Sequence, residues 1–277
     1  MTTVANRQTR PPVLGDDLRR FWNLTWTLAV TDFKLRFYGS LLGYVWTLAR
    51  PFALFGVIYV VFSEFANLGA DVPNYPVYIL FALVHFQFFA EITNGSVTSL
   101  VQRENLLRKV RFPRLVIPMA VALQALFNLG MTLVAVFIFA IANGIYPAWS
   151  WLQLPLLVGA LLMLGVGIGM TLSALFVRYR DIQPIWDVLA QMLFYGSPIL
   201  YVTTMVPDEF QHAYTASPIA SVLAQMRHAI IDPNAPPVWE AIGGAERLLI
   251  PGGLIVGAFV LGWWVFNREA PRIAENL

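Results

Sequence analysis

Long apolar stretches recur along this chain of 277 residues, and charged or turn-forming residues separate them. A helix needs about 20 mainly apolar residues to cross a bilayer. Runs of that length predict six membrane-spanning helices. They cover residues 42–65, 76–101, 115–143, 152–177, 184–206 and 248–266. The sequence therefore predicts an all-α integral membrane protein with six transmembrane helices, in which residues 42–277 form the transmembrane domain.

A polar segment with a helical period precedes the first expected span. Between residues 17 and 37, polar side chains recur every three or four positions, and apolar side chains occupy the opposite side. This pattern predicts an amphipathic helix that lies in the membrane interface. We expect residues 1–41 to form an N-terminal region that contains this interfacial helix.

The connection before the last span, residues 207–247, is long for a simple loop. Within it, apolar side chains keep a helical spacing at Ile219, Val222, Leu223, Met226 and Ile230. The segment is too short to cross a membrane, so it forms either a helix on the outer surface or a re-entrant hairpin among the spans. We favour re-entrant or gate helices.

The positions of the basic residues predict the orientation in the membrane. Counting Arg50 at the inner end of the first span, 16 of the 18 Lys and Arg residues lie on one side: before or at the start of the first span, after the last, or in the two loops between. Arg227 and Arg247 are the two exceptions. Because cytoplasmic segments are enriched in Lys and Arg, both termini are expected in the cytoplasm and three loops outside.

The composition excludes several kinds of chemistry. With 58% hydrophobic and 12% charged residues, the chain differs from a soluble enzyme. It has no cysteine, and neither Lys34 nor Lys109 follows a glycine, as the lysine of a phosphate-binding P-loop would. His85, His212 and His228 are scattered. We therefore expect no catalytic residue, metal site or cofactor on this chain.

Polar side chains inside spans are costly unless they face protein or water. Two such faces have helical spacing, one in the second expected span and one in the fifth, and each fits either a helix interface or a channel lining. A proton relay through Glu91 is a third interpretation of the first face. Aromatic side chains in the first and fifth spans could also stack on sugar rings. The channel-lining candidates are Phe52, Phe55, Tyr59, Phe62, Gln87, Glu91, Asn94, Asp187, Gln191, Tyr195 and Tyr201.

Two arginines near the inner end of the first span are candidates for binding a phosphate headgroup. Arg50 lies within or at the end of that span, and Arg36 precedes it. A guanidinium in this position can pair with phosphate or extend to the interface.

The loop between the second and third spans predicts a short charged helix over about residues 102–112, which Pro113 ends. Charge clusters in loops usually reflect topology alone. However, Leu106, Leu107 and Phe112 are apolar side chains among these charges, and a protein partner's groove would accommodate them.

Four segments in order carry a resemblance to a known family. The first is residues 34–46, KLRFYGSLLGYVW, followed by Pro51; the others are the charged loop with Phe112-Pro113, residues 178–182 (RYRDI) and residues 197–201 (SPILY). Together they resemble the membrane subunit of ABC-2 type exporters of lipid-linked polysaccharides, such as O-antigen, teichoic acid or galactan. The resemblance covers essentially the whole chain.

This resemblance implies a channel-forming permease subunit in a bacterial plasma (inner) membrane, and not an enzyme. Two copies of the chain would form the channel, and two copies of a separate ABC ATPase would bind Mg-ATP. The substrate would be a polymer linked to polyprenyl diphosphate, and no nucleic acid would be involved. The ATPase coupling residues would be Arg103, Glu104, Asn105, Leu106, Leu107 and Arg108.

Two alternative functions remain at this point. An ABC-2 exporter of small molecules or drugs would need a narrow apolar pocket in place of a continuous channel. A polyprenol-dependent membrane enzyme or proton-coupled carrier would use Glu91, Asp187 and His85, although these residues lack the paired spacing typical of such chemistry.

Overall fold

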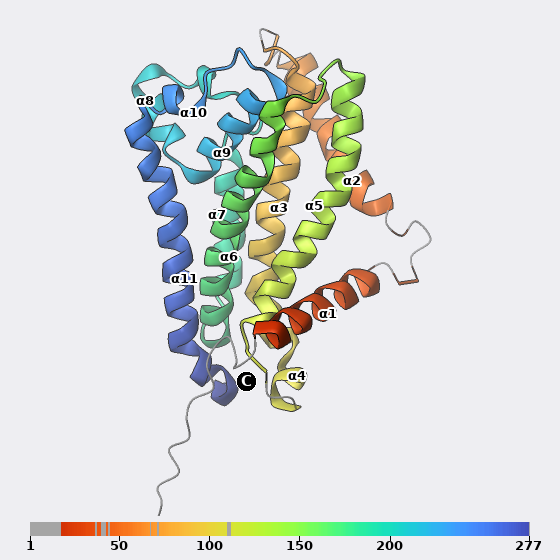
Figure 1. Ribbon diagram of the computed structural model, residues 1–277, viewed down its shortest axis with the longest axis vertical. Helices are drawn as coiled ribbons and strands as arrows, with labels where there is room; N and C mark the ends of the chain where they lie inside the picture. Colours follow the sequence, from red (N-terminus) through yellow and green to blue (C-terminus); the bar gives the residue numbers. More distant parts are fainter. Residues whose placement is uncertain are drawn as a thin grey trace, which may run out of the picture.

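The structure, a computed structural model, describes residues 18–36, 38–39, 43, 45–66, 68–70, 72–109 and 112–276, without the side chains of residues 208 and 270–276. The predicted N-terminal region before residue 18, residue 37 and residues 110–111 of the predicted coupling segment lie outside the described residues. The described part is helical and contains no strand. Long helices stand side by side, short elements cover one end, and α1 and α4 lie at the other (Figure 1).

Five helical segments are long and apolar enough to cross a membrane, among the residues described. They contain α2 (Val45–Tyr59), α3 (Tyr75–Gln102), α5 (Val116–Ala142), α6 (Leu154–Arg178) and α11 (Leu249–Asn276). A π-helical turn, Val60–Phe65, extends α2. These segments coincide with five of the six spans that the apolar runs predict.

The remaining expected span, residues 184–206, contains the shorter helix α7 (Ile182–Tyr195). Its 14 residues extend about 21 Å at 1.5 Å per residue, less than the hydrocarbon thickness of a bilayer. Pro198 follows closely, and a proline disfavours helical backbone at the residue before it. Residues 197–200 are buried without being helical. The prediction of six helical spans is thus confirmed for five.

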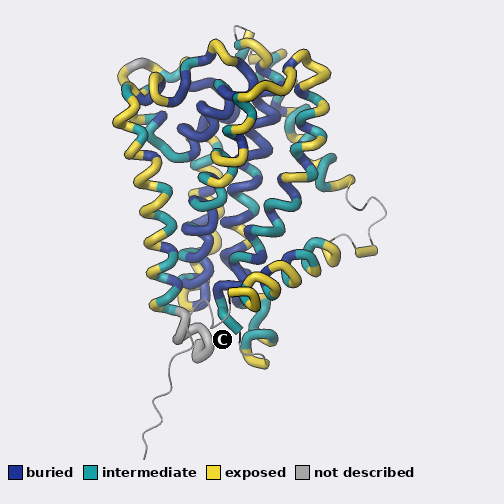
Figure 2. Tube along the Cα trace, in the orientation of Figure 1, coloured by how far each residue is buried: buried dark blue, intermediate teal, exposed yellow. Residues whose placement is uncertain are grey.

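The helix α3 forms the centre of the bundle. Nineteen of its 28 residues are buried, and it packs against α5 and α6. Figure 2 shows this burial as a dark column, whereas α11 is exposed along much of its outer side. Other helices therefore cover most of α3, whereas Asn94 on one polar face stays exposed.

The helices α6 and α11 approach each other closely at two glycines. A Cβ atom added to Gly262 would lie 2.0 Å from the carbonyl oxygen of Gly167. Neither glycine can carry a side chain unless the two backbones separate. Gly257, earlier on α11, has open space around it.

The helix expected at residues 17–37 forms as α1 (Leu18–Arg36), which lies obliquely across the end of α5 (Figure 1). The ring centroids of Trp26 and Phe33 lie 5.4 and 5.8 Å from that of Phe127 on α5. Thr25 and Ala29 are buried. Part of the apolar side of α1 therefore packs on the bundle, while Trp22 remains half exposed.

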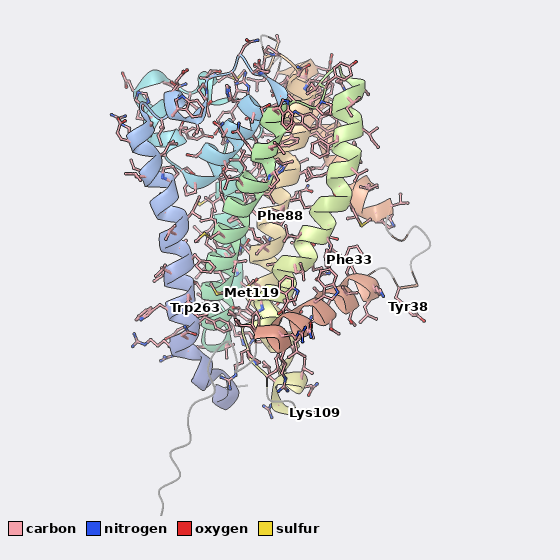
Figure 3. All side chains as sticks on the ribbon, in the orientation of Figure 1. Phe33, Tyr38, Phe88, Lys109, Met119 and Trp263 are labelled. Atoms are coloured by element: carbon pink, nitrogen blue, oxygen red, sulfur yellow. The ribbon has the colours of Figure 1, made fainter. Side chains whose placement is uncertain are left out.

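The short helix expected in the charged loop forms as α4 (Glu104–Lys109) at the end of the bundle where α1 lies. Lys109 points away from the bundle in Figure 3. The interpretation of Leu107 and Phe112 as projecting apolar residues needs correction, because both are partly buried against the core, whereas Leu106 is not among the side chains packed there. Their short distance from the ends of α3 and α5 in sequence lets them fold back onto those helices.

Short helices close the opposite end of the bundle. They are α8 (Asp208–Thr215), α9 (Pro218–Met226) with a π-helical turn at Arg227–Ile231, and α10 (Val238–Ala241). In α9, every residue from Ile219 to Met226 is buried, and the helix contacts α3, α6 and α11. The segment with helical spacing between residues 219 and 230 is thus buried among the long helices.

Candidate functional site

A cavity of about 1080 Å³ lies between α1, α2, α3 and α5. The polar face predicted on the second span, Gln87, Glu91 and Asn94, lines this cavity from α3. Arg36 and Arg50, which the sequence suggested as headgroup ligands, line it from α1 and α2. The structure therefore brings together two sets of candidate residues that the sequence treated separately.

One carboxylate oxygen of Glu91 contacts two other side chains that line the cavity. Oε1 of Glu91 accepts a hydrogen bond from Nδ2 of Asn128 at 2.6 Å and forms an ion pair with Nη1 of Arg36. Asn128 belongs to α5 and is nearly fully buried. The pairing of Glu91 with a cation and an amide explains how a carboxylate can lie within a membrane-length helix.

A second ion pair joins α1 to the residue between α3 and α4. Asp32, one helical turn before Arg36, pairs with Arg103. Arg103 caps the C-terminus of α3 and directly precedes α4. Each side chain of this pair is about a quarter exposed or less. Through these contacts α1 connects the middle of α3 to the base of α4.

The remaining cation of the cavity, Arg50, is exposed and forms no ion pair within the described ranges. Pro51, the next residue, is buried inside α2. The hydroxyl of Thr47 and Oδ1 of Asn128 also line the cavity, and neither has a hydrogen-bond partner among the described residues. The cavity thus contains polar groups able to bind a ligand.

The aromatic candidates on α2 and on the π-helical turn that extends it pack within the chain. Phe52 and Phe55 lie with their ring centroids 6.4 and 5.6 Å from that of Phe139 on α5. Tyr59 contacts Phe55, and Phe62 is partly buried against the core. This placement gives these rings a role in joining α2 to α5.

The polar candidates on α7 lie on an open face. Asp187, Gln191 and Tyr195 are exposed, whereas Trp186 and Ala190 on an adjacent side of the helix are buried. Gln183, four residues before Asp187, extends the stripe and is also exposed; its position in the same i, i+4 series could have revealed it. Beside the stripe, α7 exposes an apolar strip formed by Ile185, Val188, Leu189 and Met192.

Tyrosines fix the segment that follows α7. The Tyr201 hydroxyl donates to the carbonyl oxygen of Tyr195 at 3.1 Å and accepts from the Tyr214 hydroxyl at 3.0 Å. Tyr75 of α3 donates to the carbonyl oxygen of Leu200 at 2.5 Å. Burial raises the pKa of the Tyr214 phenol, and its hydrogen bond to Tyr201 raises it further. The phenol stays protonated, so it remains a donor.

A buried arginine, Arg227, links the π-helical turn after α9 to α3 at the end of the bundle that the short helices close. Nη2 of Arg227 lies 3.5 Å from Oδ2 of Asp232, and both side chains are less than a tenth exposed. The guanidinium also lies over the ring of Tyr78, 5.8 Å from its centroid. In the sequence, Arg227 stood out only as one of two basic residues expected outside the membrane. Its burial was not predicted, because the sequence does not show that α9 packs against α3.

The three residues proposed for an enzyme or carrier lie in different surroundings. His85 is fully buried, with Nδ1 2.7 Å from the carbonyl oxygen of Phe81. Glu91 pairs with Arg36, and Asp187 is exposed on α7. No group of three or more acidic or histidine side chains could hold a metal ion in the part of the chain that the structure describes.

Comparison with known proteins identifies relatives over most of the chain. The model of the family described as "ABC-2 type transporter" matches residues 23–231. An O-antigen export system permease protein, RfbA, of Klebsiella pneumoniae is 29% identical over 247 residues, which cover 89% of this chain and 92% of that protein. The RfbA protein of Myxococcus xanthus is 27% identical over 263 residues, covering 94% and 98%. The polysialic acid transport protein KpsM of Escherichia coli is 23% identical over 206 residues, covering 74% and 80%.

Proposed function

Because this chain belongs to the ABC-2 type transporter family, we propose that it forms the channel through which a polysaccharide linked to polyprenyl diphosphate leaves the cytoplasm. Relatives named as O-antigen export permeases match it along nearly their whole length, which supports a substrate of the O-antigen, teichoic acid or galactan type. Relatives named for polysialic acid transport also match, which supports a polymer over a small molecule.

The exposed polar stripe on α7 carries this proposal. Gln183, Asp187 and Gln191 would be costly against lipid, and the chain alone leaves them uncovered. A second copy of the chain would cover them, or enclose water beside them. We propose that two copies place these stripes along a shared channel, with Tyr195 and Tyr201 towards its outer end. The channel would then exclude the polar face of α3. That face would line the separate cavity between α1 and α5 with Gln87, Glu91 and Asn94.

ATP hydrolysis would occur on a partner. Neither lysine follows a glycine, so this chain lacks the P-loop that an ATPase needs. Two copies of a separate ABC ATPase would bind Mg-ATP, and their grooves would receive residues 103–108 of each permease. In α4, Asn105 and Arg108 are exposed and Leu106 is partly so. This face, and not Leu107, is the proposed docking surface.

The orientation follows from the basic residues. Cytoplasmic termini place α1, α4 and the cavity on the inner side of the bacterial plasma membrane, and the segment from residue 207 to 247 on the outer side. The crossing by α7 would be completed by the buried segment of residues 197–200. Residues 207–247 would form the external gate region, with the buried residues 219–231 inside it. Arg36 and Arg50 would bind the headgroup of the lipid-linked substrate at the inner side.

Labelling of single cysteines on α7 tests the channel assignment, because the chain has no native cysteine. A charged thiol reagent that cannot cross membranes reacts with the thiolate, which forms in water and not in lipid. In the assembled exporter, Gln191→Cys is therefore expected to react more than about tenfold faster than Leu189→Cys, a control on the apolar strip of the same helix. Equal rates would contradict the assignment of the polar stripe to the channel.

A further inference from the structure

The charges around the cavity leave one cation in excess. Three arginines (Arg36, Arg50 and Arg103) line it, together with Asp32 and Glu91. Glu91 pairs with Arg36 and Asp32 pairs with Arg103. Arg50 has no acidic partner in the described portion of the chain. An excess guanidinium beside a membrane favours an anionic ligand.

The carboxylate of Glu91 already occupies the place that such an anion would take. Its Oε1 binds both the Arg36 guanidinium and the Asn128 amide, which are donors of the kind that bind phosphate oxygens. The Thr47 hydroxyl, a further donor at the same cavity, is buried and has no hydrogen-bond partner among the residues that the structure describes. If Glu91 left this position, a diphosphate could bind among the donors of Arg36, Asn128, Thr47 and Arg50, which all line the cavity.

We propose that Glu91 is an internal counter-anion, which binds Arg36 and Asn128 until the diphosphate headgroup of a prenyl lipid displaces it. This inference rests on the proposed function and deepens it by assigning a regulatory role to the headgroup site. Displacement exchanges one anion for another at Arg36, so the guanidinium is never left without a counter-charge at the membrane. The affinity for the headgroup is then set by competition with Glu91.

The same contacts connect the headgroup site to the proposed ATPase docking helix. Arg36 and Asp32 are one turn apart on α1, and Asp32 holds Arg103 at the base of α4. Release of Arg36 from Glu91 removes a link between α1 and α3 while leaving the link between α1 and the base of α4. Headgroup binding thereby loosens the attachment to α3 of α1, the helix that holds the base of α4.

Binding of farnesyl diphosphate to the full chain, in nanodiscs of phosphatidylcholine, tests the proposal. The substitution Glu91→Gln removes the competing charge but keeps the size of the side chain, so it is expected to tighten binding at least about tenfold. Arg36→Gln is expected to weaken binding by at least about tenfold. Glu209→Gln, an identical charge change on exposed α8, is the matched control and should leave the dissociation constant unchanged.

The outcomes separate this inference from the proposed function. If Arg36→Gln weakens binding but Glu91→Gln leaves it unchanged or weaker, the headgroup site stands and the counter-anion proposal fails. If the wild-type chain does not bind farnesyl diphosphate, both fail. Equal competition by phosphatidylglycerol or by inorganic pyrophosphate would overturn the assignment of a prenyl diphosphate as the ligand.

A second variant keeps the test valid if Glu91→Gln lowers stability. Asn128→Asp replaces one of the donors held by Glu91 with another acceptor, so it is expected to weaken farnesyl diphosphate binding. Thermal unfolding of each variant in the same nanodiscs measures stability separately. Tighter binding by Asn128→Asp would contradict the role given to the Asn128 amide.

Discussion

Replacing Asn105 and Leu106 with Asp is expected to abolish ATP-driven export while leaving the chain folded in the membrane. Both residues lie in the first turn of α4, where acidic side chains interact favourably with the helix dipole. The helix should therefore persist, while its proposed docking face acquires two negative charges. Two carboxylates buried in a partner's groove without cations would cost several times the roughly 1.4 kcal/mol that corresponds to a tenfold change in affinity.

The measurement is co-purification of the ATPase with the variant from native membranes, together with export. A control variant carries the same number of new carboxylates, Ala213→Asp and Ala245→Asp, at exposed positions on the opposite end of the chain. The control should retain both the ATPase and export. Retention of both by the α4 variant would show that α4 is not the docking site. Leu107 is unsuitable for this test, since it packs against the core.

Replacing Gly262 with Leu is expected to be the most destabilising single substitution in the bundle. The new Cβ atom alone would overlap the carbonyl oxygen of Gly167, so α6 and α11 would have to separate. Overpacking in a well-packed region costs about 1–3 kcal/mol and more where backbone must move. Small residues at membrane helix crossings permit the close approach that replaces hydrophobic driving force in lipid.

The matched control is Gly257→Leu on the same helix, where the added side chain meets open space. Thermal unfolding in detergent should show a large loss of stability for Gly262→Leu and little change for Gly257→Leu. If the two variants lose equal stability, the crossing at Gly167 and Gly262 does not hold α6 and α11 together.

Local patterns predicted much of the fold. Five apolar runs became long helices because length and hydropathy are properties of contiguous residues. The fifth predicted span differed because an apolar run does not distinguish a helix from a buried extended segment. Residues 197–200 satisfied the apolar pattern, yet the turn near Pro198 ends the helical part.

The candidate site was only partly predictable, for a different physical reason. The spacing of Gln87, Glu91 and Asn94 showed that they share a face, and the structure places that face in the cavity. The arginine that pairs with Glu91 lies 55 positions away on α1, and no local pattern encodes such a contact. The aromatic residues of α2 were predicted as candidates for stacking on sugar rings. Two of them, Phe52 and Phe55, pack against Phe139 of α5 instead.

The most direct test of the central claim is ATP-dependent transfer of the native lipid-linked glycan into inverted membrane vesicles. Vesicles that contain this chain and its ATPase are expected to protect the glycan from added glycosidase when ATP is present. Vesicles that lack the chain should leave it accessible. Glycan that stays equally accessible with and without ATP, in vesicles that contain both proteins, would contradict the proposal that this chain forms the export channel.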